Sequence, residues 1–501
     1  MLASIPSATL LGVDGQPVWV EVHVTSGLPC YHVVGLPDAS GRESRERVRA
    51  ALLSSEAEFP LKRITVNFAP GNVRKTGAGL ELAIALGIML AESRLPEDVL
   101  EGVGVLGELG LDGTVRPVPG TLVLADALRR AGVDHLIVPM ANAHEARLLP
   151  GLTVRSARTL GEIRACLKGE LPWPDPDPPP PEPPAEDGPA SEPLDLADVR
   201  GLATARVALE VAAAGSHHLI YAGPPGAGKT MLARRLPTIL PPLDPEESFE
   251  VTRIASAAGG EPPTRLARER PFRAPHHTAS TVALVGGGSG RPQPGEVTRA
   301  HRGVLFLDEL GEFPPAALDA LRQPFEERVV RISRQALSLE LPAEFLLVAC
   351  TNPCPCGLEA AACRCSDFQR ARYRRRLSAP LLDRFDLRLR VAGPQPGDGP
   401  GEPSAVVATR VLAAVERQRH RLRATPWRRN AHVPAGALGR YVALTEAATD
   451  AWRVVVEEQT LTGRGAARVR RVARTLADLE DAPDISGEHV VLAASLRGEV
   501  P

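Results

Sequence analysis

The octapeptide GPPGAGKT, residues 223–230, decides the fold of this 501-residue chain. Residues 218–221 before it have the pattern of a strand and residues 229–240 after it that of a helix, which is the context a phosphate-binding loop requires. In such a loop the glycines let backbone amides close around phosphates, the lysine neutralises the β- and γ-phosphates, and the threonine hydroxyl binds Mg²⁺. The sequence therefore predicts an ATP and Mg²⁺ site made of Gly223, Pro224, Pro225, Gly226, Ala227, Gly228, Lys229 and Thr230.

A second motif lies further along the chain. The run VLFL at residues 304–307 is continuously apolar, which is typical of a strand buried on both faces. Asp308 and Glu309 follow it directly. Together with the phosphate-binding loop, this pattern predicts that Asp308 holds Mg²⁺ through water and that Glu309 polarises the attacking water. Alone it would be weak, because many strands end in acidic residues.

A third buried strand is expected at residues 345–349, and Asn352 follows its end. An amide at this place can position the hydrolytic water beside the γ-phosphate, which is the sensor-1 role. Because Asn352 precedes a proline, the alternative is an ordinary turn.

Arg384, in the sequence LLDRFD at residues 381–386, is the candidate arginine finger. An arginine here can reach across a subunit interface to a neighbour's γ-phosphate. The arginines at residues 374–376 are rival candidates. The structural alternative is an Arg384 that pairs with Asp383 or Asp386.

Proline divides the chain into domains. Residues 172–193 contain eleven prolines with acidic residues between them, which predicts a stiff, extended linker that holds two domains apart. A shorter glycine- and proline-rich stretch marks another boundary after residue 392. We expect an N-terminal domain over residues 1–171, an ATPase domain over 194–392, a connecting segment over 393–433 and an all-α C-terminal domain over 434–501.

Strand-like and helix-like patterns alternate before the linker, which predicts an α/β domain. Strands are expected at residues 18–24, 63–68, 102–106 and 135–139, and helices at 39–54, 80–91 and 122–130. The first element after the linker is an expected helix at 203–213.

Composition limits the classes of function. Lys and Arg number 58 against 60 Asp and Glu, so the net charge of −2 excludes a uniformly basic nucleic-acid binder but not a local basic patch. The longest apolar run, residues 82–91, is too short to span a membrane. The N-terminal residues lack the pattern of a signal peptide. Seven cysteines do not make a disulfide scaffold, so we expect a cytoplasmic protein with reduced thiols and no membrane partner.

Four of those cysteines cluster just past Asn352. Cys354, Cys356, Cys363 and Cys365 offer four thiolates, which is the ligand set of a tetrahedral, structural zinc site. Two CxC pairs are less typical of zinc than two CxxC pairs, because one intervening residue strains ligation by both thiolates. Unligated reduced thiols and a redox disulfide are the alternatives.

The sequence resembles the magnesium-chelatase-like branch of the AAA+ ATPases and, within it, the ComM/YifB family. The most specific stretch is residues 270–312, RPFRAPHHTASTVALVGGGSGRPQPGEVTRAHRGVLFLDELGE. VVGLPD at 33–38, ESRERVRAAL at 43–52 and GELGLDGTVRPVPG at 107–120 also look like that family. The resemblance implies a hexameric helicase that drives branch migration of recombination intermediates in natural transformation.

Residue roles follow from the same resemblance. Arg384 matches the arginine-finger position, Arg464 matches the sensor-2 position that opens a lid helix, and residues 328–341 match a hairpin that faces the hexamer pore. Arg331 and Arg334 alternate on this hairpin, so six copies would make a dense positive ring for branched or single-stranded DNA.

Other basic and histidine residues are less specific. The basic runs at 364–376 and 417–429 are equally well explained as solvated helix faces or ion pairs. His276 and His277 lie among proline and glycine, which favours pore or interface contacts over metal binding.

The N-terminal domain resembles the Lon protease fold, which leaves three possible functions. Residues 75–80, KTGAGL, carry Ala78 where the family usually has serine, so the Ser–Lys nucleophile of a protease is missing. Magnesium-chelatase ATPase subunits are expected to lack this domain, which argues against a chelatase-type remodeller of a protein partner. The favoured hypothesis is an ATP-dependent DNA motor.

Overall fold

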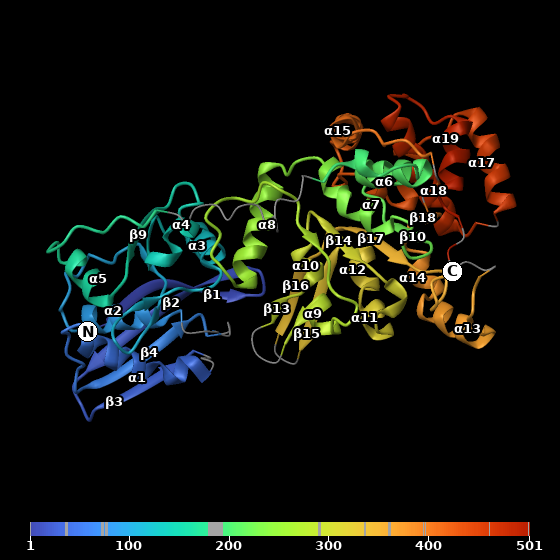
Figure 1. Ribbon diagram of the computed structural model, residues 1–501. Helices are drawn as coiled ribbons and strands as arrows, with labels where there is room; N and C mark the ends of the chain where they lie inside the picture. The colour runs from blue at the N-terminus through green and yellow to red at the C-terminus, as the bar shows by residue number, and fades with distance from the viewer. Residues whose placement is uncertain are drawn as a thin grey trace.

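The computed structural model describes residues 2–35, 39–71, 75, 79–178, 194–288, 292–334, 337–358, 362–393, 395, 397–459, 461–498 and 500, although the side chains of 39–42, 334 and 337 lie outside this description. Residues 179–193 of the expected linker also lie outside it. The chain forms an N-terminal α/β domain, a central ATPase domain and a C-terminal helical domain, drawn from blue to red in Figure 1.

The N-terminal domain contains two main sheets. The first has the strand order β1-β2-β4-β3, in which only β3 pairs parallel with its neighbour, and the second has the parallel order β5-β8-β9. The strands are β1 (Leu2–Leu11), β2 (Asp14–Thr25), β3 (Cys30–Val34), β4 (Arg63–Ala69), β5 (Val103–Val105), β6 (Glu108–Leu109), β7 (Val115–Arg116), β8 (His135–Pro139) and β9 (Thr153–Ala157). The helices are α1 (Ala39–Ser54), α2 (Glu81–Ala91), α3 (Thr121–Arg130), α4 (Ala143–Ala146) and α5 (Leu160–Leu167).

Hydrophobic patterning explains these elements. Val18, Val20, Val22 and Val24 alternate along β2 and are all buried, because side chains in a strand point to one face at every second residue. Helix α2 is buried along nearly its whole length, which accounts for its continuous apolar run. The expected elements of this domain are confirmed, including the helix over 39–54.

The ATPase domain is a parallel five-stranded sheet in the order β11-β14-β17-β10-β18. Its strands are β10 (Leu219–Ala222), β11 (Phe272–Arg273), β14 (Val304–Leu307), β17 (Leu346–Thr351) and β18 (Leu387–Arg390), with two hairpins, β12 (Gly286–Gly287) with β13 (Gln293–Pro294), and β15 (Val329–Arg334) with β16 (Leu337–Pro342). Its helices are α6 (Ala203–Gly215), α7 (Lys229–Arg235), α8 (Pro245–Ala258), α9 (Thr281–Val285), α10 (Glu296–Arg299), α11 (Pro315–Ala320), α12 (Arg322–Glu327), α13 (Asp367–Arg376) and α14 (Ala379–Leu382).

One expected helix is shorter than its pattern. The helix predicted over residues 229–240 ends at Arg235 and continues as a 3₁₀ turn, Leu236–Ile239. Pro237 has no backbone N–H to donate to the carbonyl four residues earlier, which ends the α-helix here. The buried strands expected at 304–307 and 345–349 are confirmed, the second within one or two residues.

The C-terminal domain is all helical, as expected. Its helices are α15 (Ser404–Leu422), α16 (Leu438–Tyr441), α17 (Glu446–Glu458), α18 (Gly463–Leu479) and α19 (Gly487–Ser495). Helix α15 lies within the segment expected to be a connection. It buries Val407, Val411, Ala414 and Val415 on one face, which is helical spacing that the sequence analysis overlooked.

The N-terminal and ATPase domains share one hydrophobic core. Leu10 and Val13 of the N-terminal domain belong to the same cluster as Leu339 and Leu341 of the β15–β16 hairpin. Asp14 also pairs with Arg253 of α8 at 2.7 Å. Figure 1 shows α8 between the two domains. The linker was expected to hold these domains apart, but they are in contact.

Candidate nucleotide site

The phosphate-binding loop joins β10 to α7 at the carboxyl edge of the parallel sheet. Gly226 and Gly228 have positive φ angles of 78° and 85°, which glycine adopts without strain and which turn the backbone into the loop. The first residues of α7 are Lys229 and Thr230. The fold therefore brings backbone amides and both functional side chains to the start of one helix.

Lys229 is buried within this loop. Its amine donates to the carbonyl oxygens of Gly223 at 2.6 Å and Pro224 at 2.8 Å, and to Asn352 Oδ1 at 3.3 Å. Burial lowers the pKa of Lys229. Asn352, predicted as a sensor for the nucleotide, thus lies next to the lysine that the sequence predicts to bind the phosphates.

Two oxygen donors for a magnesium ion lie side by side. Thr230 Oγ1 donates to Asp308 Oδ2 at 2.9 Å, because the ends of β10 and β14 meet at the same edge of the sheet. A hydroxyl and a carboxylate are hard oxygen ligands that suit Mg²⁺. The donor set therefore fits the ion that the sequence predicts.

Glu309 has a partner that the sequence analysis did not foresee. Its Oε2 lies 3.1 Å from Nδ1 of His277, and its backbone has a positive φ of 51°. His277 follows β11, the strand next to β14, so the sheet order brings the two residues together. The histidine pair was noticed in the sequence, but no local pattern indicates that Glu309 is its partner.

A cavity of about 620 Å³ adjoins the phosphate-binding loop. Gly223 and Pro224 line it on one side, and Arg370 and Arg374 of α13 line it on another. Arg374, a rival for the arginine-finger role, therefore lies beside the phosphate-binding loop of its own chain. The next two arginines in the sequence make other contacts. Arg375 donates to the carbonyl of Ala371, and Arg376 donates to the carbonyl of Gly311 and the carboxylate of Glu312.

Arg384 lies at the opposite end of the strands from the phosphate-binding loop. The first residue of β10, Leu219, pairs with Leu387 of β18, so Arg384 lies near the amino end of β10, whereas the phosphate-binding loop follows its carboxyl end. Its guanidinium pairs with Glu326 at 2.8 Å. Arg384 therefore cannot serve the nucleotide bound by its own chain.

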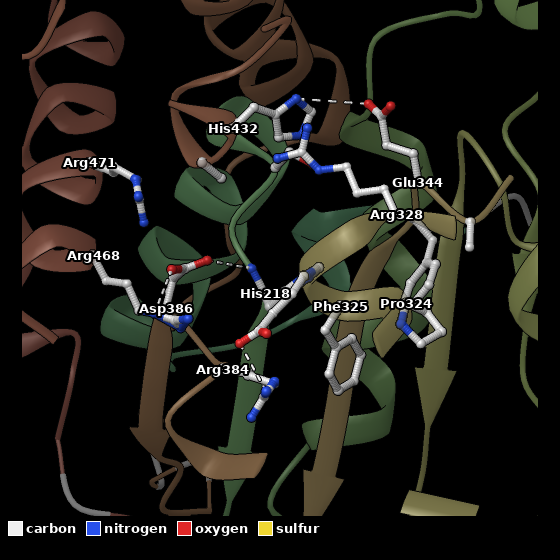
Figure 2. Close-up of a pocket in the computed structure, with 15 residues that line it drawn as sticks. His218, Pro324, Phe325, Arg328, Glu344, Arg384, Asp386, His432, Arg468 and Arg471 are labelled. Atoms are coloured by element: carbon white, nitrogen blue, oxygen red, sulfur yellow. Dashed lines mark hydrogen bonds and ion pairs between the residues drawn. The ribbon is translucent and has the colours of Figure 1, made fainter. Parts of the chain in front are cut away.

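Figure 2 shows that Arg384 belongs to a buried polar cluster around a cavity of about 80 Å³. Burial lowers the pKa of His218 in this cluster to about 4, and its Nδ1 accepts a hydrogen bond from the Leu347 amide at 3.1 Å. Burial opposes ionisation of Asp386, but the neighbouring His217 at 3.6 Å and the charge of Arg468 hold its pKa well below the usual range. The Asp386 carboxylate is thus charged and held among cations.

The remaining predicted residues lie outside this cluster and the cavity. Arg464 is exposed in the first turn of α18, whose N-cap is Thr462. Arg331 is exposed on β15 and pairs with Glu340 at 2.7 Å and with Glu327. Arg334 ends β15, but its side chain lies outside the described residues.

The four clustered cysteines come together. Their sulfur atoms all lie within 4.8 Å of one another, and the residues are free of disulfides. Burial raises the pKa of Cys354 to about 12, whereas the backbone N–H groups of Arg364 and Leu358 lower the pKa of Cys356 to about 6. Four clustered cysteines that bind a metal as thiolates suit zinc.

The basic run over 417–429 serves the fold. Arg417 pairs with Asp481 at 2.6 Å, and Arg421 pairs with the buried Asp478 at 2.6 Å. These ion pairs join α15 to the end of α18 and the turn that follows it, which favours the structural alternative for this run. None of the described helices is long and apolar enough to cross a membrane.

The sheet order and the loop define the class of the protein, a P-loop protein of the AAA+ type with a helical C-terminal domain. Three family profiles match the chain: "Magnesium chelatase, subunit ChlI" over residues 195–398, "Subunit ChlI of Mg-chelatase" over 20–142, and "Magnesium chelatase, subunit ChlI C-terminal" over 401–497.

Relatives that match along nearly their full length identify the family more closely. An uncharacterized protein of Mycobacterium tuberculosis is 43% identical over 98% of this chain and 97% of its own. YifB of Salmonella typhimurium is 40% identical over 99% and 97%, and the competence protein ComM of Haemophilus influenzae is 38% identical over 100% and 98%. The chain belongs to the magnesium-chelatase-like AAA+ family that includes YifB and ComM.

Partial likenesses bear on the N-terminal domain. Lon protease 2 of Bacillus subtilis is 31% identical over 187 residues, 32% of this chain, in agreement with a Lon-like fold. Ala78, on which the argument against proteolysis rests, lies outside the described residues, although Lys75 is buried. A family profile described as "Subunit ChlI of Mg-chelatase" matches residues 20–142, which include most of this domain.

Proposed function

We propose that this chain is an ATP-dependent, hexameric DNA motor of the cytoplasm, a branch-migration helicase that acts on recombination intermediates during natural transformation. One observation carries the proposal. Lys229 and Asp308 lie at one edge of the sheet, whereas Arg384 lies at the other, so hydrolysis that uses Arg384 needs a second subunit. The competence protein ComM is a full-length relative.

The roles of the residues follow from their positions. Lys229 binds the β- and γ-phosphates of ATP, and Thr230 with Asp308 binds Mg²⁺, which supplies charge neutralisation. Glu309 accepts a proton from water while Asn352 orients that water. Arg384 completes the neighbouring subunit's site, Arg464 contacts nucleotide from the C-terminal domain, and Arg331 with Arg334 contacts DNA. The four clustered cysteines hold a structural zinc ion.

The decisive experiment is ATP-dependent dissociation of a labelled four-way DNA junction by the full chain. Lys229→Ala should abolish nucleotide binding and junction dissociation together, because the amine lies inside the phosphate-binding loop. Glu309→Gln should bind ATP without hydrolysing it. Arg384→Ala should lose hydrolysis only in the assembled ring. Wild-type hydrolysis by Glu309→Gln would remove that residue as the base.

The second candidate is a chelatase-type remodeller of a protein partner. The three chelatase-subunit profiles favour it, since together they cover all three domains. ATP hydrolysis that no DNA stimulates, with the four-way junction left intact, would support the remodeller and overturn the DNA motor.

A further inference from the structure

The four-cysteine cluster adjoins the phosphate-binding loop, and that position has a consequence for nucleotide binding. Cys354 and Cys363 line the same cavity of about 620 Å³ as Gly223 and Pro224. The cavity beside the phosphate-binding loop therefore has the cysteine cluster as one of its walls.

The sulfur geometry matches a single tetrahedral ion. A zinc ion with four Zn–S bonds of about 2.3 Å separates its sulfurs by about 3.8 Å. The sulfurs of Cys354 and Cys356 lie 3.2 Å apart, those of Cys354 and Cys363 lie 3.5 Å apart, and those of Cys356 and Cys363 lie 3.8 Å apart. A disulfide would need about 2.05 Å, so these separations suit an ion better than a covalent bond.

Hydrogen-bond donors surround the sulfurs. The backbone N–H groups of Arg364 and Leu358 lie near Cys356, and the Arg370 side chain lies near Cys363. Zinc with four thiolates carries a net charge of −2, and such donors stabilise it, as outer-shell groups do in metal sites. Arg370 comes from α13, so the metal would join this helix to the loop.

The cluster also contacts the phosphate-binding loop. Gly357, with a φ of 74°, closes the turn that follows Cys354, and its amide donates to the Cys354 carbonyl at 2.9 Å. A Cβ at Gly357 would lie 2.8 Å from the ring of Pro225. The turn therefore packs directly on the loop, with space only for glycine.

Two further contacts extend the connection. Asn352 lies two residues before Cys354, and its side chain contacts Lys229 at 3.3 Å. Tyr373 of α13 lies 3.1 Å from Thr351 at the end of β17. An ion held by all four cysteines would fix the turn, Asn352 and α13 relative to one another.

We propose that zinc bound by Cys354, Cys356, Cys363 and Cys365 holds the turn that packs on the phosphate-binding loop in place, so that tight ATP binding requires the metal. The inference rests on the proposed ATP site and deepens it. On binding, Zn²⁺ displaces the protons of the thiols that are still protonated and forms four Zn–S bonds, with no oxidation or reduction. The metal regulates nucleotide binding without contacting the nucleotide.

The test measures metal content and nucleotide affinity separately on the full chain. Elemental analysis should find one zinc ion per chain. Removal of zinc with a chelator under reducing conditions should weaken binding of a fluorescent ATP analogue by about tenfold or more, and added Zn²⁺ should restore it. Cys363→Ser should lose zinc and affinity together, whereas Cys166→Ser, outside the cluster, should keep both.

Gly357→Ala provides a second test if the cysteine variant does not fold. This variant retains all four ligands but pushes a methyl group toward Pro225, so it should keep its zinc and bind the ATP analogue more weakly. Unchanged affinity in the folded, zinc-free chain would overturn the coupling. Absence of zinc, or a Cys–Cys disulfide by mass spectrometry, would overturn the metal site. A zinc-loaded chain that binds no ATP analogue would instead overturn the proposed function.

Discussion

Glu309 pairs with a histidine instead of facing solvent alone. Its contact with His277 holds the carboxylate in one direction at 3.1 Å, toward the loop after β11. A carboxylate held by His277 is less free to turn toward the water that the proposed role of Glu309 requires. The resting chain therefore restrains the residue that we propose as the hydrolytic base.

His277→Ala should raise DNA-independent ATP turnover. Loss of one hydrogen bond of about 0.5–1.5 kcal/mol predicts a rise of about two- to tenfold, measured by phosphate release at saturating ATP. His276→Ala is the matched control, because His276 hydrogen-bonds to Thr278 and its ring lies tilted beside that of His277. A fall in turnover for His277→Ala alone would mean that the contact orients Glu309 productively.

His218 makes the stability of the ATPase domain sensitive to acid. Its pKa of about 4 in the fold lies below the ordinary 6.5, because the ring is buried. As pH falls below 6.5 the unfolded chain takes up a proton that the folded chain refuses until about pH 4, so stability is full above pH 6.5 and is lost on acidification. Protonation would also break the hydrogen bond that Nδ1 accepts from Leu347.

His218→Gln should therefore make the stability of the ATPase domain less dependent on pH. In the wild type, the shifted pKa of His218 lowers the free energy of unfolding by about 2 kcal/mol between pH 7 and pH 5. The variant lacks this decrease. Thermal midpoints at the two pH values measure the difference, and His420→Gln at the exposed end of α15 is the control. Equal acid responses of wild type and His218→Gln would contradict the assignment, even though the buried His432 shifts in the same direction.

At the scale of elements, motifs with a local cause were predictable from sequence. The phosphate-binding loop and the strand before Asp308 are specified by neighbouring residues, and both are present. The end of α7 was missed although Pro237 marks it, and α15 was missed although its apolar spacing is helical. The contact of His277 with Glu309 could not be predicted, because it depends on sheet order, which residue spacing does not reveal.

On the β15–β16 hairpin, acidic neighbours partly neutralise a positive charge that the sequence predicts to be available to DNA. Arg331 lies opposite Glu340 in the strand pairing and bonds to its carboxylate at 2.7 Å, and it also pairs with Glu327. A phosphate must compete with both acids for this arginine. The sequence predicted a positive hairpin because it did not reveal which acids face which arginines.

Charge substitutions on this hairpin should therefore act in opposite directions. Arg331→Ala should weaken DNA binding and reduce the salt slope by about one for each phosphate interaction removed, with basal hydrolysis unchanged. Glu340→Gln should strengthen binding by freeing the arginine. Anisotropy of labelled single-stranded DNA across a salt series measures both. Identical slopes for the two variants and the wild type would exclude this residue from the DNA site.

At the scale of the whole molecule, the N-terminal domain rests on the base of the same hairpin. Leu339 and Leu341 pack under the β1–β2 turn, and a Cβ at Gly12 would lie 2.6 Å from a Leu339 methyl. Glu145 of the N-terminal domain also meets Ser256 of α8 at 2.5 Å. The sequence could not predict this contact, since a proline-rich linker indicates separation but cannot exclude docking.

This contact predicts a role for the N-terminal domain in positioning the hairpin. Gly12→Ala should displace Leu339 and reduce DNA-stimulated ATP turnover several-fold, while basal turnover stays unchanged. Gly102→Ala is the matched control. Gly102 has nearly the same φ, 67° against 65°, with nothing within 4 Å of an added Cβ. Both variants carry the same left-handed strain of about 1–2 kcal/mol, so a difference between them isolates the hairpin contact. Equal DNA stimulation in the two variants would show that the N-terminal domain does not position the hairpin through Gly12.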